Sequence, residues 1–178
     1  NEKYFLYLGT IEPRKNLERL IKAYVKLVSR HKDVPQLVLA GGNGWYYDDI
    51  FQMIDTCHLK EQVVFTGYVD QKDSPLLMSG AMAFVFPSLY EGFGMPPLEA
   101  MACGTPVITS KTSSLPEVVG DAGILVDPEN VDEICEAMEK MMNEPVYRET
   151  LGLKGKKRAD KFTWQKSAEQ LMNVYQKL

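Results

Sequence analysis

Short apolar runs alternate with amphipathic segments along almost the whole chain. The apolar runs have no polar face, and Gly, Pro or polar residues follow them. This pattern is typical of buried strands in a parallel sheet. It predicts strands at Tyr4–Leu8, Gln36–Ala40, Val63–Thr66, Ala83–Phe86, Pro106–Thr109 and Gly123–Val126.

The segments between these runs have the apolar spacing of helices. Asn16 precedes the clearest apolar stripe and is the expected N-cap of its helix. That stripe consists of Leu17, Leu20, Ile21, Tyr24, Leu27 and Val28. Further helices are predicted at about Asp48–Leu59, Ser74–Gly80, Pro97–Cys103 and Val131–Asn143.

The alternation of strands and helices predicts one α/β domain. We expect a Rossmann-like, doubly wound parallel sheet of about six strands, with helices on both faces. After the last strand the pattern is purely helical, which predicts a core over about residues 1–160 and a terminal helix over residues 161–178. This helix could cover its own sheet or reach a neighbour. The basic cluster at residues 154–158 is interpreted as a solvated helix face, with contact to an anionic surface as the alternative.

Composition and charge exclude several classes of protein. Hydrophobic residues make up 45% of the 178 residues and the net charge is only −4, which excludes a disordered chain. The 20 basic residues do not outnumber the 24 acidic ones, which argues against a nucleic-acid-binding protein. No apolar run approaches about 18 residues, so no transmembrane helix is expected. The chain starts at Asn1 without a signal peptide, and we expect a fragment of a cytoplasmic protein.

The cysteines and histidines do not have the spacing of a metal site. Cys57, Cys103 and Cys135 lie far apart and form no CxxC pair, so we expect reduced and mostly buried thiols. His31 and His58 are isolated near the ends of amphipathic stretches, where surface or capping roles are favoured.

The loop after the first predicted strand carries candidate chemistry. In open α/β sheets, ligands bind beyond the carboxyl ends of the strands. This loop leaves its strand at Gly9 and places Arg14 and Lys15 directly before a helix. Two cations beside the free amides of a helix start would hold a phosphate or diphosphate. An ordinary loop with solvated charges is the alternative.

The loop after the second predicted strand is rich in glycine. It contains Gly41 and Gly42, followed by Asn43, Gly44 and Trp45. Glycines permit a ligand to approach the backbone closely, but they could equally serve only to turn the chain. The loop matches neither G-x-G-x-x-G nor the P-loop pattern, which disfavours a nicotinamide-dependent dehydrogenase or an ATPase.

The loop after the fourth predicted strand contains two carboxylates around a Gly-Phe-Gly turn. Glu91 precedes the turn, and Glu99 is expected in the first turn of the helix that two prolines begin. Gly92 and Gly94 would let backbone amides face a ligand, and carboxylates accept hydrogen bonds from sugar hydroxyls. In the structural alternative, Glu99 only complements the helix dipole and Glu91 is exposed.

The segment from Glu91 to Glu99 closely resembles the Glu–seven residues–Glu signature of the retaining glycosyltransferases of family 4, whose fold is called GT-B. Other segments resemble further motifs of that family in the usual order. They are Gly9 with Arg14-Lys15-Asn16, Val64–Val69, Ala102–Ile108, Leu115–Gly123 and Phe162-Thr163-Trp164. The resemblance covers only the C-terminal, donor-binding half of such an enzyme. We therefore expect the N-terminal acceptor domain to be absent and the isolated chain to be inactive.

The resemblance implies transfer of a hexosyl group from a nucleoside-diphosphate sugar to an acceptor hydroxyl, with retention of configuration. It implies that Arg14 and Lys15 stabilise the leaving diphosphate, that Glu91 contacts the hexose, and that Glu99 binds the ribose. By the same resemblance, donor contacts extend to Gly9, Gly41, Gly42, Tyr68, Val69, Gly92, Phe93, Gly94, Met95 and Leu98.

GDP-mannose is the favoured donor, with UDP-sugars and ADP-sugars as alternatives. The loop from Gly9 to Asn16 looks most like that of mannosyltransferases acting on bacterial surface polysaccharides. No Asp-x-Asp triplet occurs, and the cationic pair can replace a metal, so we predict catalysis without a metal or other cofactor. Front-face attack assisted by the leaving group is preferred to a covalent Glu91 intermediate.

The expected acceptor is a glycan or a lipid-linked saccharide. This places the full-length enzyme in the cytoplasm, with peripheral attachment at the inner face of the membrane. Two alternatives stay open. One is a non-catalytic nucleotide-sugar-binding module, and the other is a related GT-B enzyme, such as a starch- or glycogen-synthase-like enzyme or a nucleotide-sugar epimerase.

Overall fold

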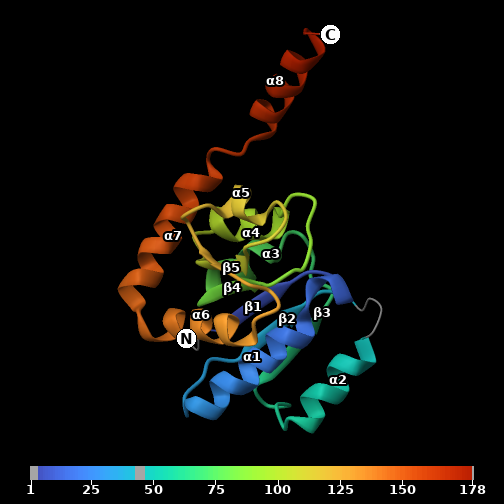
Figure 1. The fold of residues 1–178 in the computed structure, drawn as a ribbon, viewed down its shortest axis with the longest axis vertical. Coiled ribbons are helices and arrows are strands. Elements are labelled where there is room, and N and C mark those ends of the chain that lie inside the picture. The colour runs from blue at the N-terminus through green and yellow to red at the C-terminus, as the bar shows by residue number, and fades with distance from the viewer. Residues whose placement is uncertain (1–3, 43–46, 178) are drawn as a thin grey trace.

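The computed structural model describes residues 4–42 and 47–177 and contains a six-stranded sheet (Figure 1). The strands lie in the order β3-β2-β1-β4-β5-β6, and every neighbouring pair is parallel. The order reverses direction between β1 and β4, as in a doubly wound sheet. The strands are β1 (Phe5–Leu8), β2 (Leu37–Ala40), β3 (Val63–Gly67), β4 (Ala83–Phe86), β5 (Val107–Ser110) and β6 (Ile124–Val126).

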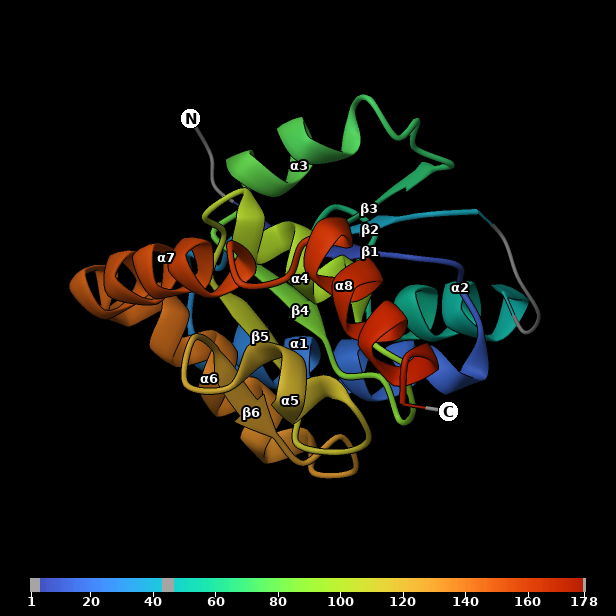
Figure 2. The ribbon, with the colours of Figure 1, turned by 90° about the horizontal axis from the view of Figure 1, so that it is seen from above.

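Helices cover both faces of this sheet. Helices α1, α2 and α6 lie on one face, and α3, α4 and α7 lie on the other (Figure 2). Because both faces are covered, the four central strands β2, β1, β4 and β5 are almost entirely buried, whereas the outer strands β3 and β6 are partly exposed. The helices are η1 (Pro13–Lys15, a 3-10 turn), α1 (Leu17–Arg30), α2 (Tyr47–Thr56), α3 (Ser74–Gly80), α4 (Met95–Ala102), α5 (Leu115–Val119), α6 (Val131–Asn143), α7 (Pro145–Ala159) and α8 (Trp164–Tyr175).

The structure confirms the predicted α/β class and the six predicted strands, whose ends differ from the expected ones by at most one residue. The apolar pattern missed α5, which spans only the five residues Leu115–Val119. So short a helix presents little more than one turn, and an apolar period cannot be recognised over that length.

Asn16 does not cap α1 as predicted. Its backbone is left-handed, with φ 62° and ψ 35°, and its side chain accepts no capping hydrogen bond from the start of the helix. Instead the buried side-chain amide donates to the carbonyl of Pro87 at 2.9 Å and to that of Pro128 at 2.7 Å. A buried amide must find hydrogen-bond partners. Asn16 therefore joins the start of α1 to the segments that follow β4 and β6.

The basic cluster at residues 154–158 is only in part the solvated face that the sequence predicted. Lys154 is exposed beside Asp121, with 3.4 Å between Nζ and Oδ2. Arg158, however, donates from Nε to the carbonyl of Val118 and from Nη2 to that of Glu117, both at 2.5 Å. The last carbonyls of a helix lack intrahelical donors, so this guanidinium stabilises the end of α5 against α7.

All three thiols are free, but only Cys135 is fully buried, whereas Cys57 and Cys103 are half-buried. The expectation of mostly buried thiols was therefore too strong. His31 ends α1 and its Nε2 lies 2.6 Å from Oε1 of Glu139, which agrees with the expected surface role. Across residues 4–42 and 47–177, no group of three His, Cys, Asp or Glu side chains is placed to hold a metal ion.

The terminal helix α8 extends away from the sheet (Figure 1). It therefore does not cover its own sheet, which was one of the two predicted placements, and it contains no buried residue. Its apolar side chains are exposed, and they are Trp164, Leu171, Met172, Val174 and Tyr175. In the described part of the chain, no helix has the length and hydrophobicity needed to cross a membrane.

Two glycines bring the loops after β1 and β2 into direct backbone contact. Gly41 has φ 146°, and a Cβ atom at this position would lie 2.0 Å from the carbonyl oxygen of Gly9. We expect Gly41→Ala to lower the free energy of unfolding by at least about 1–3 kcal/mol, the usual cost of a strained backbone. Urea denaturation measures this change.

Gly42→Ala is the matched control, because a Cβ atom there would meet no atom of the described residues 4–42 and 47–177 within 4 Å. The control should unfold at nearly the same urea concentration as the unmodified chain. Equal destabilisation by the two substitutions would contradict the close approach of the loops.

Candidate functional site

The predicted site residues gather where β1 and β4 lie side by side. These strands pair through Phe5 with Ala83 and Leu6 with Phe84, and the strand order reverses between them. The loops that leave their carboxyl ends therefore emerge next to each other, which is where open α/β sheets bind ligands. One loop leads into η1, and the other runs from Pro87 to the start of α4.

Lys15, Arg14 and Glu91 form one cluster of charges between these loops. Lys15 Nζ lies 2.6 Å from Glu91 Oε1, and Arg14 Nη1 lies 2.9 Å from Glu91 Oε2. The side chains of Lys15 and Glu91 are each only 10% exposed. Arg14 also contacts Glu12, with 2.5 Å between Nη2 and Oε1. Two cations and two carboxylates thus balance one another.

Local structure determines where Lys15 points. Pro13 begins the 3-10 turn η1, and Lys15 ends it, so its side chain turns inward beneath the loop. The ammonium lies 4.8 Å from the centre of the Phe86 ring, at the end of β4. A cation over an aromatic face is stabilised by the ring quadrupole, so Phe86 makes burial of this lysine less costly.

The surroundings of Glu91 lower its pKa. Burial acts to raise it, but hydrogen bonds from Lys15 and Ser88 and the charge of Lys15 together outweigh burial, with a further contribution from Arg14. The buried hydroxyl of Ser88 lies 2.7 Å from Glu91 Oε1. Glu91 is therefore a paired carboxylate, and the alternative in which it is simply exposed is wrong.

Sequence reasoning missed Glu12 and Ser88 as members of the cluster. Glu12 lies in the same loop as Arg14, and its acidic side chain beside two cations was a visible signal. Ser88 is the second residue after β4, and its role depends on a contact with Glu91 three residues later, which no motif predicts. Both residues complete the balance of charges and hydrogen bonds around Arg14 and Lys15.

Helix α4 begins earlier than predicted and changes the place of Glu99. Gly94, with φ 114°, precedes the helix, which starts at Met95 rather than at Pro97. The first turn therefore contains no acidic residue, and Glu99 lies in the second turn. Glu99 is exposed and makes no ion pair with any residue that the structure describes. Partial desolvation of its carboxyl group by the surrounding side chains and backbone raises its pKa. Glu99 therefore does not complement the helix dipole.

The remaining predicted donor residues lie at the same edge of the sheet. Gly9, Gly41 and the end of β3 are joined by backbone bonds, from Gly9 N to Ala40 O and from Gly41 N to Gly67 O, both at 2.9 Å. Tyr68, 78% exposed, and the half-buried Val69 follow β3, two strands away from β1. Gly92, Phe93, Met95 and Leu98 follow Glu91 along the chain, in the end of its loop and in α4. Part of the second loop, Asn43, Gly44 and Trp45, lies outside the described residues.

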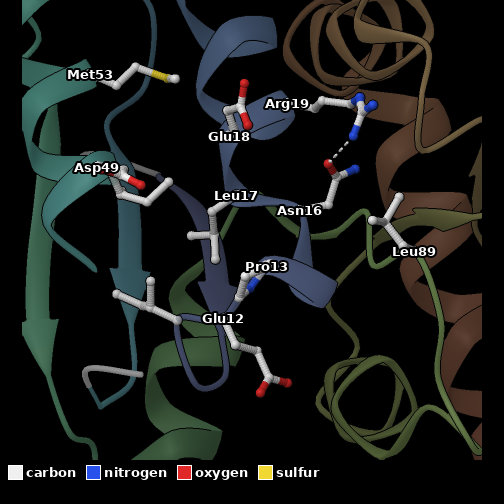
Figure 3. A pocket seen from close by; sticks show the side chains of 11 residues that line it. Glu12, Pro13, Asn16, Leu17, Glu18, Arg19, Asp49, Met53 and Leu89 are labelled. Atoms are coloured by element: carbon white, nitrogen blue, oxygen red, sulfur yellow. Dashed lines mark hydrogen bonds between the residues drawn. The ribbon is translucent and has the colours of Figure 1, made fainter. Parts of the chain in front are cut away.

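A cavity of about 640 Å³ lies beside this cluster, between α1, α2 and the loop before η1. Asp49 and Met53 of α2 face Leu17 and Glu18 of α1 across it (Figure 3). Of the charged cluster, only Glu12 lines this cavity, and Lys15 and Glu91 do not. The predicted donor residues thus lie on the open edge of the sheet and not inside this cavity.

Comparison with known proteins gives a consistent result. The family model described as "Glycosyl transferases group 1" matches residues 1–158. The chain is 41% identical over 175 residues to O-antigen chain mannosyltransferase B of Escherichia coli. The alignment covers 98% of this chain and 46% of that relative. The chain therefore spans less than half the length of this relative.

Two solved structures share the fold. Sucrose-phosphate synthase from Thermosynechococcus elongatus superposes with a TM-score of 0.88 and 31% identity, over 99% of this chain and 45% of that one. The C-terminal domain of the group 1 glycosyl transferase LpcC from Francisella tularensis superposes with a TM-score of 0.79 and 24% identity, over 89% and 85% of the two chains. The second likeness concerns the fold alone.

Replacing the paired carboxylate should make stability depend less on pH. Because the pKa of Glu91 is lowered by folding, its ionised form stabilises the protein above the ordinary pKa of 4.5, and this contribution is lost as the pH falls through the lower folded value. We expect Glu91→Gln to be less stable than the unmodified chain at neutral pH, with the difference shrinking in acid. Urea unfolding over a pH series measures it, and a difference that did not change with pH would contradict the pairing.

Proposed function

The chain belongs to the group 1 glycosyl transferases, and we propose that it is the donor-binding half of a retaining hexosyltransferase that uses GDP-mannose. The observation that carries the proposal is the Lys15–Glu91–Arg14 cluster at the point where the strand order reverses. It joins two cations to a carboxylate beside the start of α4. These are the groups needed to bind a diphosphate and a sugar side by side.

The two cations would stabilise the charge that develops when the donor is cleaved. The bond between the anomeric carbon and the diphosphate oxygen breaks, and the acceptor oxygen forms a bond to the same face of that carbon. The acceptor's proton passes to the departing diphosphate, whose negative charge is closest to Lys15 and Arg14. Fixed charges that meet the charge of a transition state are a major source of catalysis.

Donor binding would require the cations to exchange partners. Glu12 and Glu91 pair with them in the structure. An entering diphosphate would take over the role of the Glu91 carboxylate, which would then accept hydrogen bonds from hydroxyls of the hexose. The same groups thus serve both the empty and the occupied site.

The nucleoside would extend along the edge of the sheet from this point. The exposed carboxylate of Glu99 is free to accept hydrogen bonds from the ribose hydroxyls. The backbone near Tyr68 and Val69 would read the edge of the base. The mannosyltransferase relative from Escherichia coli supports mannose as the sugar. A synthase is the second candidate, which the 31% identity to sucrose-phosphate synthase favours.

The acceptor would be bound mainly by a second, N-terminal domain. The chain covers 46% of the mannosyltransferase relative and 45% of the sucrose-phosphate synthase chain, which leaves room in both for another domain of similar size. We propose that the exposed apolar residues of α8 pack on that domain. A glycan or lipid-linked acceptor then places the full-length enzyme in the cytoplasm, at the inner face of the membrane.

The chain should bind GDP in the presence of a chelator, because Lys15 and Arg14 supply the positive charge that a metal would otherwise supply. We expect Lys15→Ala to weaken GDP binding about 10- to 100-fold, as for the loss of one hydrogen bond to a charged group. Isothermal titration with GDP, UDP and ADP measures both effects and identifies the base.

Lys22→Ala is the control, since Lys22 is exposed on α1 and, among the residues that the structure describes, pairs only with Glu18, one helical turn away. Its affinity for GDP should equal that of the unmodified chain. If none of the three nucleotides bound, the donor-site proposal would be wrong.

Glu99→Ala should weaken nucleotide binding by removing the acceptor of the ribose hydroxyls. We expect the affinity for GDP to fall about tenfold, while the melting temperature stays unchanged because the side chain is exposed. Titration of GDP and differential scanning fluorimetry on the same samples measure the two quantities. An unchanged affinity would remove Glu99 from the site.

A further inference from the structure

The end of β5 and the segment that follows it form hydrogen bonds along the length of the loop that carries Glu91. Between Thr109 and Ser114, five of the six residues are serine or threonine, and each of their hydroxyls bonds the segment from Phe86 to Phe93. The hydroxyls of Thr109, Ser110 and Thr112 donate to the carbonyls of Phe86, Ser88 and Leu89, at 2.7, 2.6 and 3.3 Å.

Two consecutive serines hold the backbone of Glu91 itself. The amide of Glu91 donates to Ser113 Oγ at 3.1 Å. The hydroxyl of Ser114 lies 2.9 Å from the carbonyl oxygen of Glu91 and 2.7 Å from that of Phe93. Backbone pairing between β4 and β5 ends at Phe86. Beyond it, the hydroxyls of Ser113 and Ser114 supply the hydrogen-bond partners that the backbone of β5 no longer offers.

Ser113 adopts a backbone conformation that is unfavourable for its residue type. Its φ is 53°, in the left-handed region, where a side chain with a Cβ atom is strained. Such strain persists only where the surrounding structure enforces it, and it is common at functional sites. Here the strained residue is the one whose hydroxyl accepts the amide of Glu91.

We propose that Ser113 and Ser114 are positioning residues that hold Glu91 at the place where its carboxylate meets Lys15, Arg14 and the donor sugar. The serines fix both polar groups of the Glu91 backbone, and Lys15, Arg14 and Ser88 hold the carboxylate. The placing of Glu91 against the donor sugar rests on the proposed function. The placing of its carboxylate against Lys15 and Arg14 does not.

The test separates positioning from ordinary structural support. Ser113→Gly removes the hydroxyl and also relieves the strain, because glycine accepts a left-handed backbone. Ser114→Ala removes the other hydroxyl, and Ser114→Thr keeps it. We expect Ser113→Gly to melt no lower than the unmodified chain. In Ser113→Gly and Ser114→Ala, the ratio of the affinity for GDP-mannose to the affinity for GDP should fall about threefold to tenfold. Ser114→Thr, which keeps the hydroxyl, should have the same ratio as the unmodified chain.

His58→Gly is the matched control. His58 also has a left-handed backbone, with φ 56°. It lies between α2 and β3, before the amino end of β3, whereas the candidate site lies at the carboxyl ends of the strands. This substitution should relieve strain without changing either affinity. An equal loss of affinity for GDP and GDP-mannose in the serine variants, together with a lower melting temperature, would mean that the serines only support the fold, and would overturn the proposal.

A measurement without ligand keeps the two proposals distinguishable. Titration of the Glu91 carboxyl by NMR should give a pKa closer to the ordinary glutamate value in Ser113→Gly and Ser114→Ala than in the unmodified chain. If the unmodified chain bound no nucleotide, the proposed function would fail, but this titration would still decide whether the serines position Glu91. An unchanged Glu91 pKa in both variants would overturn the positioning role.

Discussion

The nearly buried ion pair between Lys15 and Glu91 is the interaction on which the site depends. Each side chain is only 10% exposed, and charges removed from water are stable only when they are paired and hydrogen-bonded. The pair therefore forces the loops after β1 and β4 to stay together. Ser88, Phe86 and the serines after β5 each stabilise a part of this arrangement, so the parallel sheet and the charged cluster support one another.

Compensation of charge holds the cluster of Arg14, Lys15, Glu12 and Glu91 together. Two adjacent cations would repel each other, but Glu12 and Glu91 neutralise them. An anionic ligand does not meet bare charges, since it must displace a carboxylate that already satisfies them. Under the proposed function such a site would be selective, because a ligand that offers a second partner for Glu91 would recover the interactions that the displacement loses. A sugar attached to a diphosphate is a ligand of this kind.

The sequence predicted most of the fold and about half of the site. Buried strands have apolar faces and sharp polar ends, so local patterns located them to within one residue. The motifs pointed to Arg14, Lys15 and Glu91, which the structure brings together in one cluster and whose roles stay a prediction. The errors arose where long-range contacts decide the local structure. Asn16 bonds two distant loops and so does not cap a helix, and Arg158 closes the end of α5 and is not fully solvated. Glu99 lies one turn later in its helix because Gly94 permits an earlier start.

The positions of the strands along the chain, the residue types at the loop ends and the family resemblance could all be determined from the sequence alone, because they follow from patterns only a few residues long. Only the tertiary structure decided which polar groups meet. Lys15 and Glu91 are 76 residues apart, and the serines that hold Glu91 follow it by more than 20 residues. Contacts of this kind depend on the pairing of β1, β4 and β5, which brings distant segments to the same edge of one sheet. No local pattern encodes that pairing.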